Sequence, residues 1–117
     1  MKNILLVVGV AVFLGSAMWY IARPKSAYGN LDQFAQCLAE KEIVMYGAEW
    51  CSHCQNEKAQ FGKSFKYVPY VECPDNPKVC LEKGVEGYPT WILPDGTKLV
   101  GEQGLEGLSE KSGCPLP

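Results

Sequence analysis

The sequence predicts an α/β fold, a mixed four-stranded sheet with helices on both faces, preceded by one N-terminal transmembrane helix. Two observations support this prediction. After residue 25, helical and strand patterns alternate and end in a hairpin, giving two βα units followed by an antiparallel pair. Before residue 25 lies a long uncharged apolar run. The 117 residues allow one small domain. Residues 1–25 are therefore assigned to a membrane anchor or signal peptide with the start of a linker, and residues 26–117 to the α/β domain.

The candidate membrane segment is the apolar run at residues 4–22. At about 1.5 Å per residue it spans roughly 28 Å, close to the hydrocarbon thickness of a bilayer. Trp19 and Tyr20 lie where an interfacial aromatic belt is expected. The alternative is a cleavable signal peptide with its cleavage site at the small residues 15–17. Because the run continues past that site, we expect a single-pass anchor in the cell membrane, with secretion after cleavage as the alternative.

The first half of the domain has the pattern helix, strand, helix. Asn30 is a candidate helix cap, and the apolar spacing across Leu31–Leu38 places one helix face in a core. The continuous apolar run Ile43–Tyr46 is typical of a strand covered on both faces. A second helix is predicted over Cys51–Phe65, with Gly62 as its interior weak point.

The second half has the pattern strand, short helix, hairpin, helix. Pro69 fits only at the start of a strand, because proline donates no hydrogen bond to a neighbouring strand. Asn76 and Pro77 form a helix start, and Gly84 ends that helix. The four residues 94–97 form a hairpin turn. The expected elements are a strand at 70–73, a helix from 77, strands at 91–93 and 98–100, and a helix at 105–112.

Charge and cysteine content restrict the function classes. The net charge is -2, from 11 basic and 13 acidic residues. Three of the basic residues precede residue 30, so 8 basic residues remain beside all 13 acidic ones in the domain. An acidic domain without a Lys/Arg cluster is a poor nucleic-acid binder. Six cysteines suggest metal binding or catalysis in the cytosol and disulfides in an exported protein.

Cys51 and Cys54 form a Cys-Ser-His-Cys motif between a buried strand and a helix start. A helix N-terminus stabilises anions, so Cys51 is the expected nucleophile. Cys54 is adjacent on the helix surface and is the expected resolving thiol. His53, when protonated, adds positive charge beside Cys51 and favours the dithiol, which makes the disulfide a stronger oxidant. Half of a zinc site and a plain structural disulfide are the alternatives. No second ligand pair has zinc spacing, so we predict no metal site.

Two motifs resemble the thioredoxin family. Residues 47–54, GAEWCSHC, resemble its active-site motif, and residues 88–90, YPT, resemble its cis-proline loop. The resemblance implies a thioredoxin-like fold in which Pro89 is cis and lies against the active-site disulfide, while Tyr88 helps to hold the substrate. Trp50 abuts the reactive cysteine and is a further candidate for an apolar substrate groove.

A closer resemblance covers most of the domain. The segments MYGAEWCSHCQNEKAQFG, YVECP, GVEGYPTW and LSEKSGC resemble the thioredoxin-like domain of bacterial vitamin K epoxide reductase homologues. This implies a thiol–disulfide oxidoreductase facing the periplasm or cell exterior, with no cofactor besides its own disulfide. Its implied partners are exported protein thiols and a quinone-linked membrane oxidoreductase of the vitamin K epoxide reductase or DsbB type. The alternatives are a reductase that delivers electrons to exported proteins and a non-catalytic metal or structural cysteine module.

The other four cysteines are Cys37, Cys73, Cys80 and Cys114, and the residues alone allow three pairings. The related fused domains have two additional disulfides, which implies the pairs Cys73–Cys80 and Cys37–Cys114 in this chain.

One position departs from the thioredoxin pattern. Thioredoxins carry a buried acid six residues before the first active-site cysteine, and this chain has Met45 there. The proton acceptor for Cys54 is therefore unassigned. Glu49 and Glu57 are near in sequence, but we expect both to be solvated, as glutamates near a helix start usually are.

Overall fold

The computed structural model describes residue 3 and residues 28–117. The predicted anchor or signal peptide at residues 1–25 lies outside the described residues, apart from residue 3. Among the helices formed by the described residues, none has both the length and the apolar character needed to cross a membrane.

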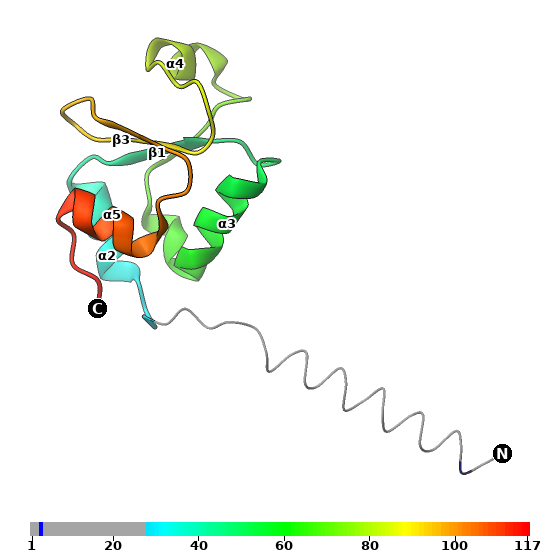
Figure 1. Ribbon diagram of the computed structural model, residues 1–117, viewed down its shortest axis with the longest axis vertical. Coiled ribbons are helices and arrows are strands. Elements are labelled where there is room, and N and C mark those ends of the chain that lie inside the picture. Colours follow the sequence, from blue (N-terminus) through cyan, green and yellow to red (C-terminus); the bar gives the residue numbers. More distant parts are fainter. Residues whose placement is uncertain (1–2, 4–27) are drawn as a thin grey trace.

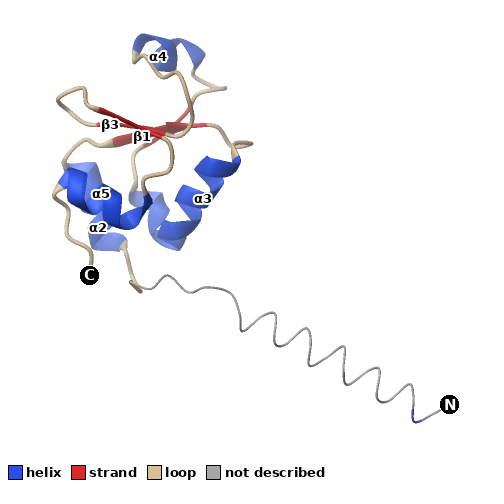
Figure 2. Ribbon diagram, in the orientation of Figure 1, coloured by secondary structure: helices blue, strands red, loops and turns tan. Residues whose placement is uncertain are grey.

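A mixed sheet of four strands forms the centre of the domain, in the order β2-β1-β3-β4 (Figure 2). Central β1 (Val44–Gly47) pairs in parallel with β2 (Tyr70–Glu72) and antiparallel with β3 (Thr90–Ile92). Strand β4 (Lys98–Val100) adds to β3 through the hairpin. The predicted mixed four-stranded sheet is therefore confirmed. The apolar run around β1 reflects its place between two neighbours, with helices on both faces.

Helices cover both faces of this sheet (Figure 1). Helices α2 (Asp32–Glu40), α3 (Ser52–Phe61) and α5 (Gly104–Ser112) lie on one face, and the short α4 (Pro77–Glu82) lies on the other. A 3₁₀ helix, η1 (Gly62–Tyr67), continues α3. The β1–α3–β2 connection makes the parallel strand pair, and it carries the Cys-Ser-His-Cys motif at its first turn.

Two helix ends differ from the prediction. The helix expected to reach Phe65 ends at Phe61, because Gly62 adopts a φ of 56° that a regular helix does not allow. At the start of α2, the cap position is occupied by a leucine with no side-chain capping bond. Asn30 instead accepts a hydrogen bond from the backbone N–H of Asp32 at 2.8 Å, which forms an Asx turn before the helix.

The main core lies between the sheet and the three helices α2, α3 and α5. Trp91 is fully buried there and packs against Phe61, with ring centroids 6.2 Å apart. The other large members of this core are Leu31, Phe34, Leu38, Met45 and Leu108. The core therefore holds α3, and with it the cysteine motif, against the edge of the sheet where β1 ends.

Two disulfides link the periphery of the domain. Cys37 of α2 pairs with Cys114 beyond α5, 77 residues later, and Cys73 pairs with Cys80 of α4. These are the two pairs that the resemblance implies. Each bridge lies on a different face of the sheet, and Cys51 and Cys54 are free.

Candidate active site

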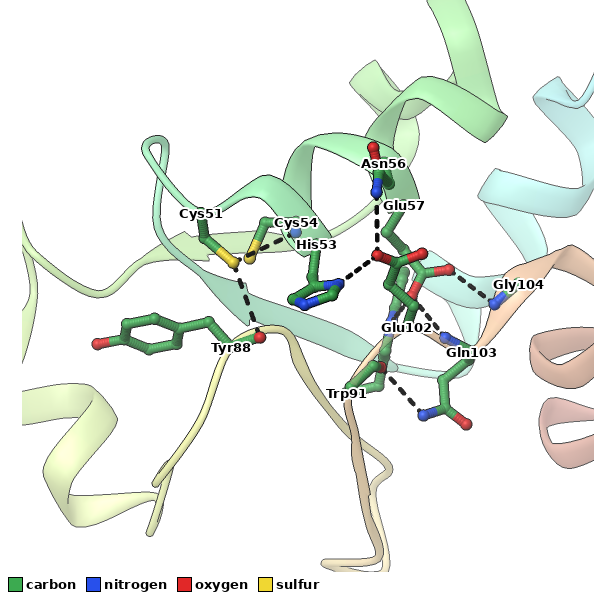
Figure 3. A network of polar contacts seen from close by, with 11 residues as sticks. Cys51, His53, Cys54, Asn56, Glu57, Tyr88, Trp91, Glu102, Gln103 and Gly104 are labelled. Carbon is green, nitrogen blue, oxygen red and sulfur yellow. Dashed lines mark hydrogen bonds and ion pairs between the residues drawn. The ribbon is translucent and has the colours of Figure 1, made fainter.

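Cys51 occupies the cap position of α3. Strand β1 ends at Gly47, and the Cys51 N–H bonds the carbonyl of Ala48 at 3.1 Å, which turns the chain into the helix. Cys51 has an extended ψ of 120°, so its side chain points back over the first turn. Its Sγ accepts a hydrogen bond from the backbone N–H of Cys54 at 3.3 Å (Figure 3). A sulfur held at free helix amides is stabilised as an anion.

Cys54 lies deeper than Cys51 and is completely buried. Burial raises the pKa of the Cys54 thiol to about 12, and its hydrogen bond with Cys51 adds to the shift. A substrate sulfur therefore reaches Cys51 first, while Cys54 is protected until it attacks Cys51. This difference suits the nucleophile and resolving roles predicted from the sequence.

The loop before β3 lies against the cysteines from the other side. The Tyr88–Pro89 peptide bond is cis, as the resemblance implies. The Cys51 thiol donates to the backbone carbonyl of Tyr88 at 3.7 Å, and the carbonyl of Pro89 accepts from the N–H of Gly101 at 2.8 Å. The loop is thus tied both to the reactive sulfur and to the segment that follows β4.

Two aromatic side chains lie beside the site. Trp50 is 71% exposed, and its ring meets that of Tyr88 edge to face at 5.9 Å. Trp91 of β3 is completely buried in the core and does not line the surface beside the cysteines. An exposed indole packed against a half-buried phenol ring, next to a reactive sulfur, provides apolar contact area for a peptide. Binding of a substrate by Trp50, Tyr88 and Pro89 stays a prediction.

His53 contacts a carboxylate that sequence reasoning did not identify. Its Nδ1 lies 2.6 Å from Oε1 of Glu102, and Asn56 donates to the same oxygen at 3.1 Å (Figure 3). The His53 bond, followed by the Asn56 bond, lowers the pKa of Glu102. Glu102 is 49 residues away in sequence, so nothing in the local pattern around the motif indicates it. The tuning role of His53 stays a prediction, and Glu102 is the charged group it contacts.

The prediction that Glu57 is solvated is wrong, because Glu57 is 0% exposed. Its carboxylate accepts hydrogen bonds from the backbone N–H groups of Gln103 at 2.7 Å and Gly104 at 2.9 Å. A weaker third bond comes from Nε1 of Trp91 at 3.4 Å. Burial is tolerated because the N-terminus of α5 supplies donors and a favourable dipole. The sequence did contain a signal for this burial, because the helical spacing of Glu57 from Cys54 and Phe61 puts all three on the same helix face.

On the β2 side of Cys54, the sulfur lies beside Gly47 and the ring of Tyr70. Met45 is fully buried and lies opposite Tyr70 in the β1–β2 register. A Cβ built on Gly47 would lie 2.9 Å from Sγ of Cys54 and 3.3 Å from the Tyr70 ring, so the thiol and ring share the space above a glycine. The Tyr70 hydroxyl lies 3.4 Å from the same position and donates to Glu72 at 3.3 Å.

No three His, Cys, Asp or Glu side chains of the described residues converge in a way that would hold a metal ion. The described site contains two sulfurs, a helix amide donor and the surrounding charges. These groups support nucleophilic exchange between a thiolate and a disulfide.

Comparison with known proteins identifies the family. The thioredoxin family model matches residues 26–112. The chain belongs to the thioredoxin family. It is 44% identical to "Thiol-disulfide oxidoreductase LTO1" of Arabidopsis thaliana over 81 residues, which cover 62% of this chain and 21% of that protein. It is 32% identical to "Protein disulfide isomerase-like 2-2" of Oryza sativa over 114 residues, covering 79% of this chain and 30% of that protein.

The chain thus matches less than a third of the length of these two relatives. A solved thioredoxin of Fasciola hepatica is 22% identical, with a TM-score of 0.48, over 61% of this chain and 76% of that one. The two curated relatives are a thiol–disulfide oxidoreductase and a protein disulfide isomerase-like protein by name, and the described geometry of the two free cysteines suits exchange of that kind.

Proposed function

We propose that this thioredoxin-family chain is a membrane-anchored extracytoplasmic oxidase, which passes the Cys51–Cys54 disulfide to thiols of exported proteins. The observation that carries the proposal is the placement of the two free cysteines at the start of α3. Cys51 is held by a helix amide and faces the Tyr88 carbonyl, and Cys54 is completely buried behind it. One sulfur is placed for encounter with a partner and the other for resolution.

The proposed cycle begins with the Cys51–Cys54 disulfide. A substrate thiolate attacks Sγ of Cys51, the disulfide breaks, and the electron pair leaves on Cys54, which then takes up a proton. A second substrate thiolate attacks the substrate sulfur of the mixed disulfide and releases Cys51 as a thiolate. Two electrons have then moved from the substrate dithiol to the enzyme. A quinone-linked membrane oxidoreductase of the vitamin K epoxide reductase or DsbB type takes these electrons and restores the disulfide.

The oxidising direction is supported by the groups around the sulfurs. A disulfide is a stronger oxidant when its dithiol form is stabilised. The helix amide donates to the Cys51 sulfur, the proposed role of His53 is to add positive charge beside it, and the apolar Met45 stands where other thioredoxins have a buried acid. The membrane partner is proposed from the resemblance of residues around the two motifs to the domain of bacterial vitamin K epoxide reductase homologues.

The proposed location is supported by the uncharged run at residues 4–22 and by the two disulfides, which are typical of oxidising compartments. Alkylation of Cys51 in intact cells by a membrane-impermeant thiol reagent tests it. Labelling of the membrane fraction supports an anchored, externally facing domain. Labelling only after lysis overturns this placement, and recovery of the chain in the medium indicates signal cleavage.

The decisive experiment measures the reduction potential of the Cys51–Cys54 pair in glutathione buffers, using the full chain in mild detergent. We expect a value near the ~-120 mV of a strong oxidant. A value near ~-270 mV indicates the alternative, a reductase that delivers electrons to exported proteins. Oxidation of a reduced secreted test protein is measured in parallel, and we expect Cys51→Ser to abolish it. Stoichiometric zinc together with unchanged behaviour of Cys51→Ser would instead indicate a metal or structural cysteine module.

A further inference from the structure

A lysine of α3 lies one helical turn beyond the buried resolving cysteine. Lys58 follows Cys54 by four residues, a spacing that places both on the same helix face. The Lys58 ammonium lies 3.8 Å from the centroid of the Tyr70 ring and 5.5 Å from that of Phe65. The two rings meet edge to face at 5.8 Å. A long, flexible side chain is therefore held in place by two aromatic faces.

The same aromatic ring connects Lys58 to the buried thiol. The edge of Tyr70 and Sγ of Cys54 both lie within 3.3 Å of the position that a Cβ on Gly47 would occupy. Because Gly47 has no side chain, the Cys54 sulfur and the Tyr70 ring share that space. The Lys58 ammonium lies over the face of the same ring. The positive charge of Lys58 lowers the pKa of Cys54, opposing the larger effect of burial.

The other ionisable groups near Cys54 are two carboxylates and the Cys51 thiol. The Glu57 carboxylate is bonded to the first amides of α5. The Glu72 carboxylate accepts from the Tyr70 hydroxyl and from the backbone N–H of Glu49, beyond the phenol. Cys51, when ionised, disfavours a second negative charge on Cys54. Lys58 is thus the cation that acts on Cys54 among the groups that flank it.

From this placement we infer that Lys58 is the electrostatic partner of the Cys54 thiolate, and that Tyr70 and Phe65 are positioning residues that hold the ammonium beside it. The inference rests on the proposed exchange function and deepens it. When a thiolate attacks Cys51, the electron pair of the broken disulfide leaves on Cys54, and Lys58 balances that charge until a proton arrives. In the opposite step, the thiolate of Cys54 attacks Cys51 in a mixed disulfide, and Lys58 increases the fraction that is ionised.

The test separates the two cysteines kinetically, using the full-length reduced protein and the aromatic disulfide dithiobis(nitrobenzoate). Cys51 attacks the reagent in a concentration-dependent phase and releases one coloured thiolate. Cys54 then attacks the mixed disulfide on Cys51 and releases the second in a concentration-independent phase. We expect Lys58→Met to slow the second phase about tenfold at neutral pH and to move its pH profile about one unit upward, with the first phase within twofold.

The chain supplies a matched control. Lys66 lies 4.9 Å from the centroid of the Tyr67 ring, so Lys66→Met removes the same charge and the same kind of aromatic contact on η1. We expect Lys66→Met to leave both phases unchanged and Lys58→Arg to restore the second phase to within threefold. Tyr70→Phe keeps the ring that holds the ammonium and removes the hydroxyl that donates to Glu72, so comparing it with Lys58→Met separates the effect of the charge from that of the phenol.

Several results would overturn the inference. They are an unchanged second phase in Lys58→Met, equal slowing of both phases, or the same slowing in Lys66→Met. Slowing by Tyr70→Phe but not by Lys58→Met would assign the effect to a proton path through the phenol. Circular dichroism verifies the fold of each variant, and Lys58→Gln replaces Lys58→Met if the latter does not fold. Failure of the proposed function is distinguishable, because the unsubstituted chain would then show no second phase or would not oxidise protein thiols.

Discussion

Glu57 and Lys58 are neighbours on α3 with opposite charges, and the fold places them in opposite surroundings. The Glu57 carboxylate is completely buried on the α5 flank, where two backbone amides and an indole donate to it. The Lys58 ammonium lies on the β2 flank, over the rings of Tyr70 and Phe65. The comparison shows that a buried charge is tolerated where hydrogen-bond donors meet it, and that a cation can be held by aromatic faces without any carboxylate.

The two flanks also differ in what they do for the cysteine motif. The Glu57 flank holds the start of α5, and Glu102, which contacts His53, lies two residues before that start. The Lys58 flank faces Cys54 across Gly47. One flank therefore positions the groups around Cys51, and the other sets the charge near Cys54. The predictions below test this division, beginning with the largest expected effect.

Removing the charge of Glu57 should destabilise the α5 flank most. In Glu57→Gln, the side-chain NH₂ group replaces one of the two oxygens that accept from the backbone N–H groups of Gln103 and Gly104. One acceptor is lost, and the remaining hydrogen bond is no longer charge-assisted. We expect the free energy of unfolding to fall by about 3 kcal/mol, measured by urea unfolding with the disulfides intact. Glu110→Gln removes an exposed charge from α5 and is the control. Equal unfolding midpoints for the two variants would show that Glu57 does not anchor the helix.

The second prediction concerns whether burial or the charge of Lys58 has the larger effect on the pKa of the Cys54 thiol. The pKa of this thiol is raised to about 12 in the folded protein, against ~8.5 in an unfolded chain. Since the folded pKa is the higher one, the stabilisation is present below pH ~8.5 and is lost progressively as pH rises toward 12. At pH ~10 the loss should be about 2 kcal/mol.

The measurement compares urea unfolding of Cys51→Ala with that of Cys51→Ala/Cys54→Ala. Cys51→Ala removes the smaller contribution of Cys51 to the raised pKa of Cys54 and leaves burial, its largest cause. The difference between the two curves isolates the titration of Cys54 from that of other groups. Parallel stability curves between pH 8 and 10 would mean that the charge of Lys58 compensates the effect of burial.

The smallest effect is expected at Glu102, the exposed carboxylate of the α5 flank. Its pKa is lowered by bonds from His53 and Asn56, so it remains charged at neutral pH. Exposed ion pairs are weak and screened by salt. We expect Glu102→Gln to change the rate of the first exchange phase by less than about threefold at low salt, and the change to vanish at about 1 M salt. A salt-independent change of tenfold or more would place Glu102 in the reaction itself.

Local pattern was sufficient for most of the fold. The apolar run of β1, the helix start beside Cys51 and the turn after β3 all depend on short-range backbone preferences, whereas the end of α3 at Gly62 was predicted only as a weak point. Such preferences act within a few residues, so they are readable without knowing what packs against them. The mixed sheet followed from their order along the chain.

The site was predictable only where its parts are close in sequence or match a known motif. Cys51, His53 and Cys54 form one turn of helix, and the cis bond before Pro89 was implied by the resemblance. Glu102 could not be found in this way, because it reaches His53 from 49 residues away. The surroundings of Glu57 were predicted wrongly for the same reason, since its donors belong to α5.

The sequence by itself determined the order of elements, the reactive pair and the side of the helix on which each cysteine lies, because these follow from helical and strand periodicity. Only the tertiary structure decided which charges meet that pair. It brought α5 to Glu57 and β2 to Lys58, because burial of the apolar faces of these elements against one core sets their positions. Electrostatic interactions depend on distance in space, so the charges that surround the two sulfurs are a property of the packed domain.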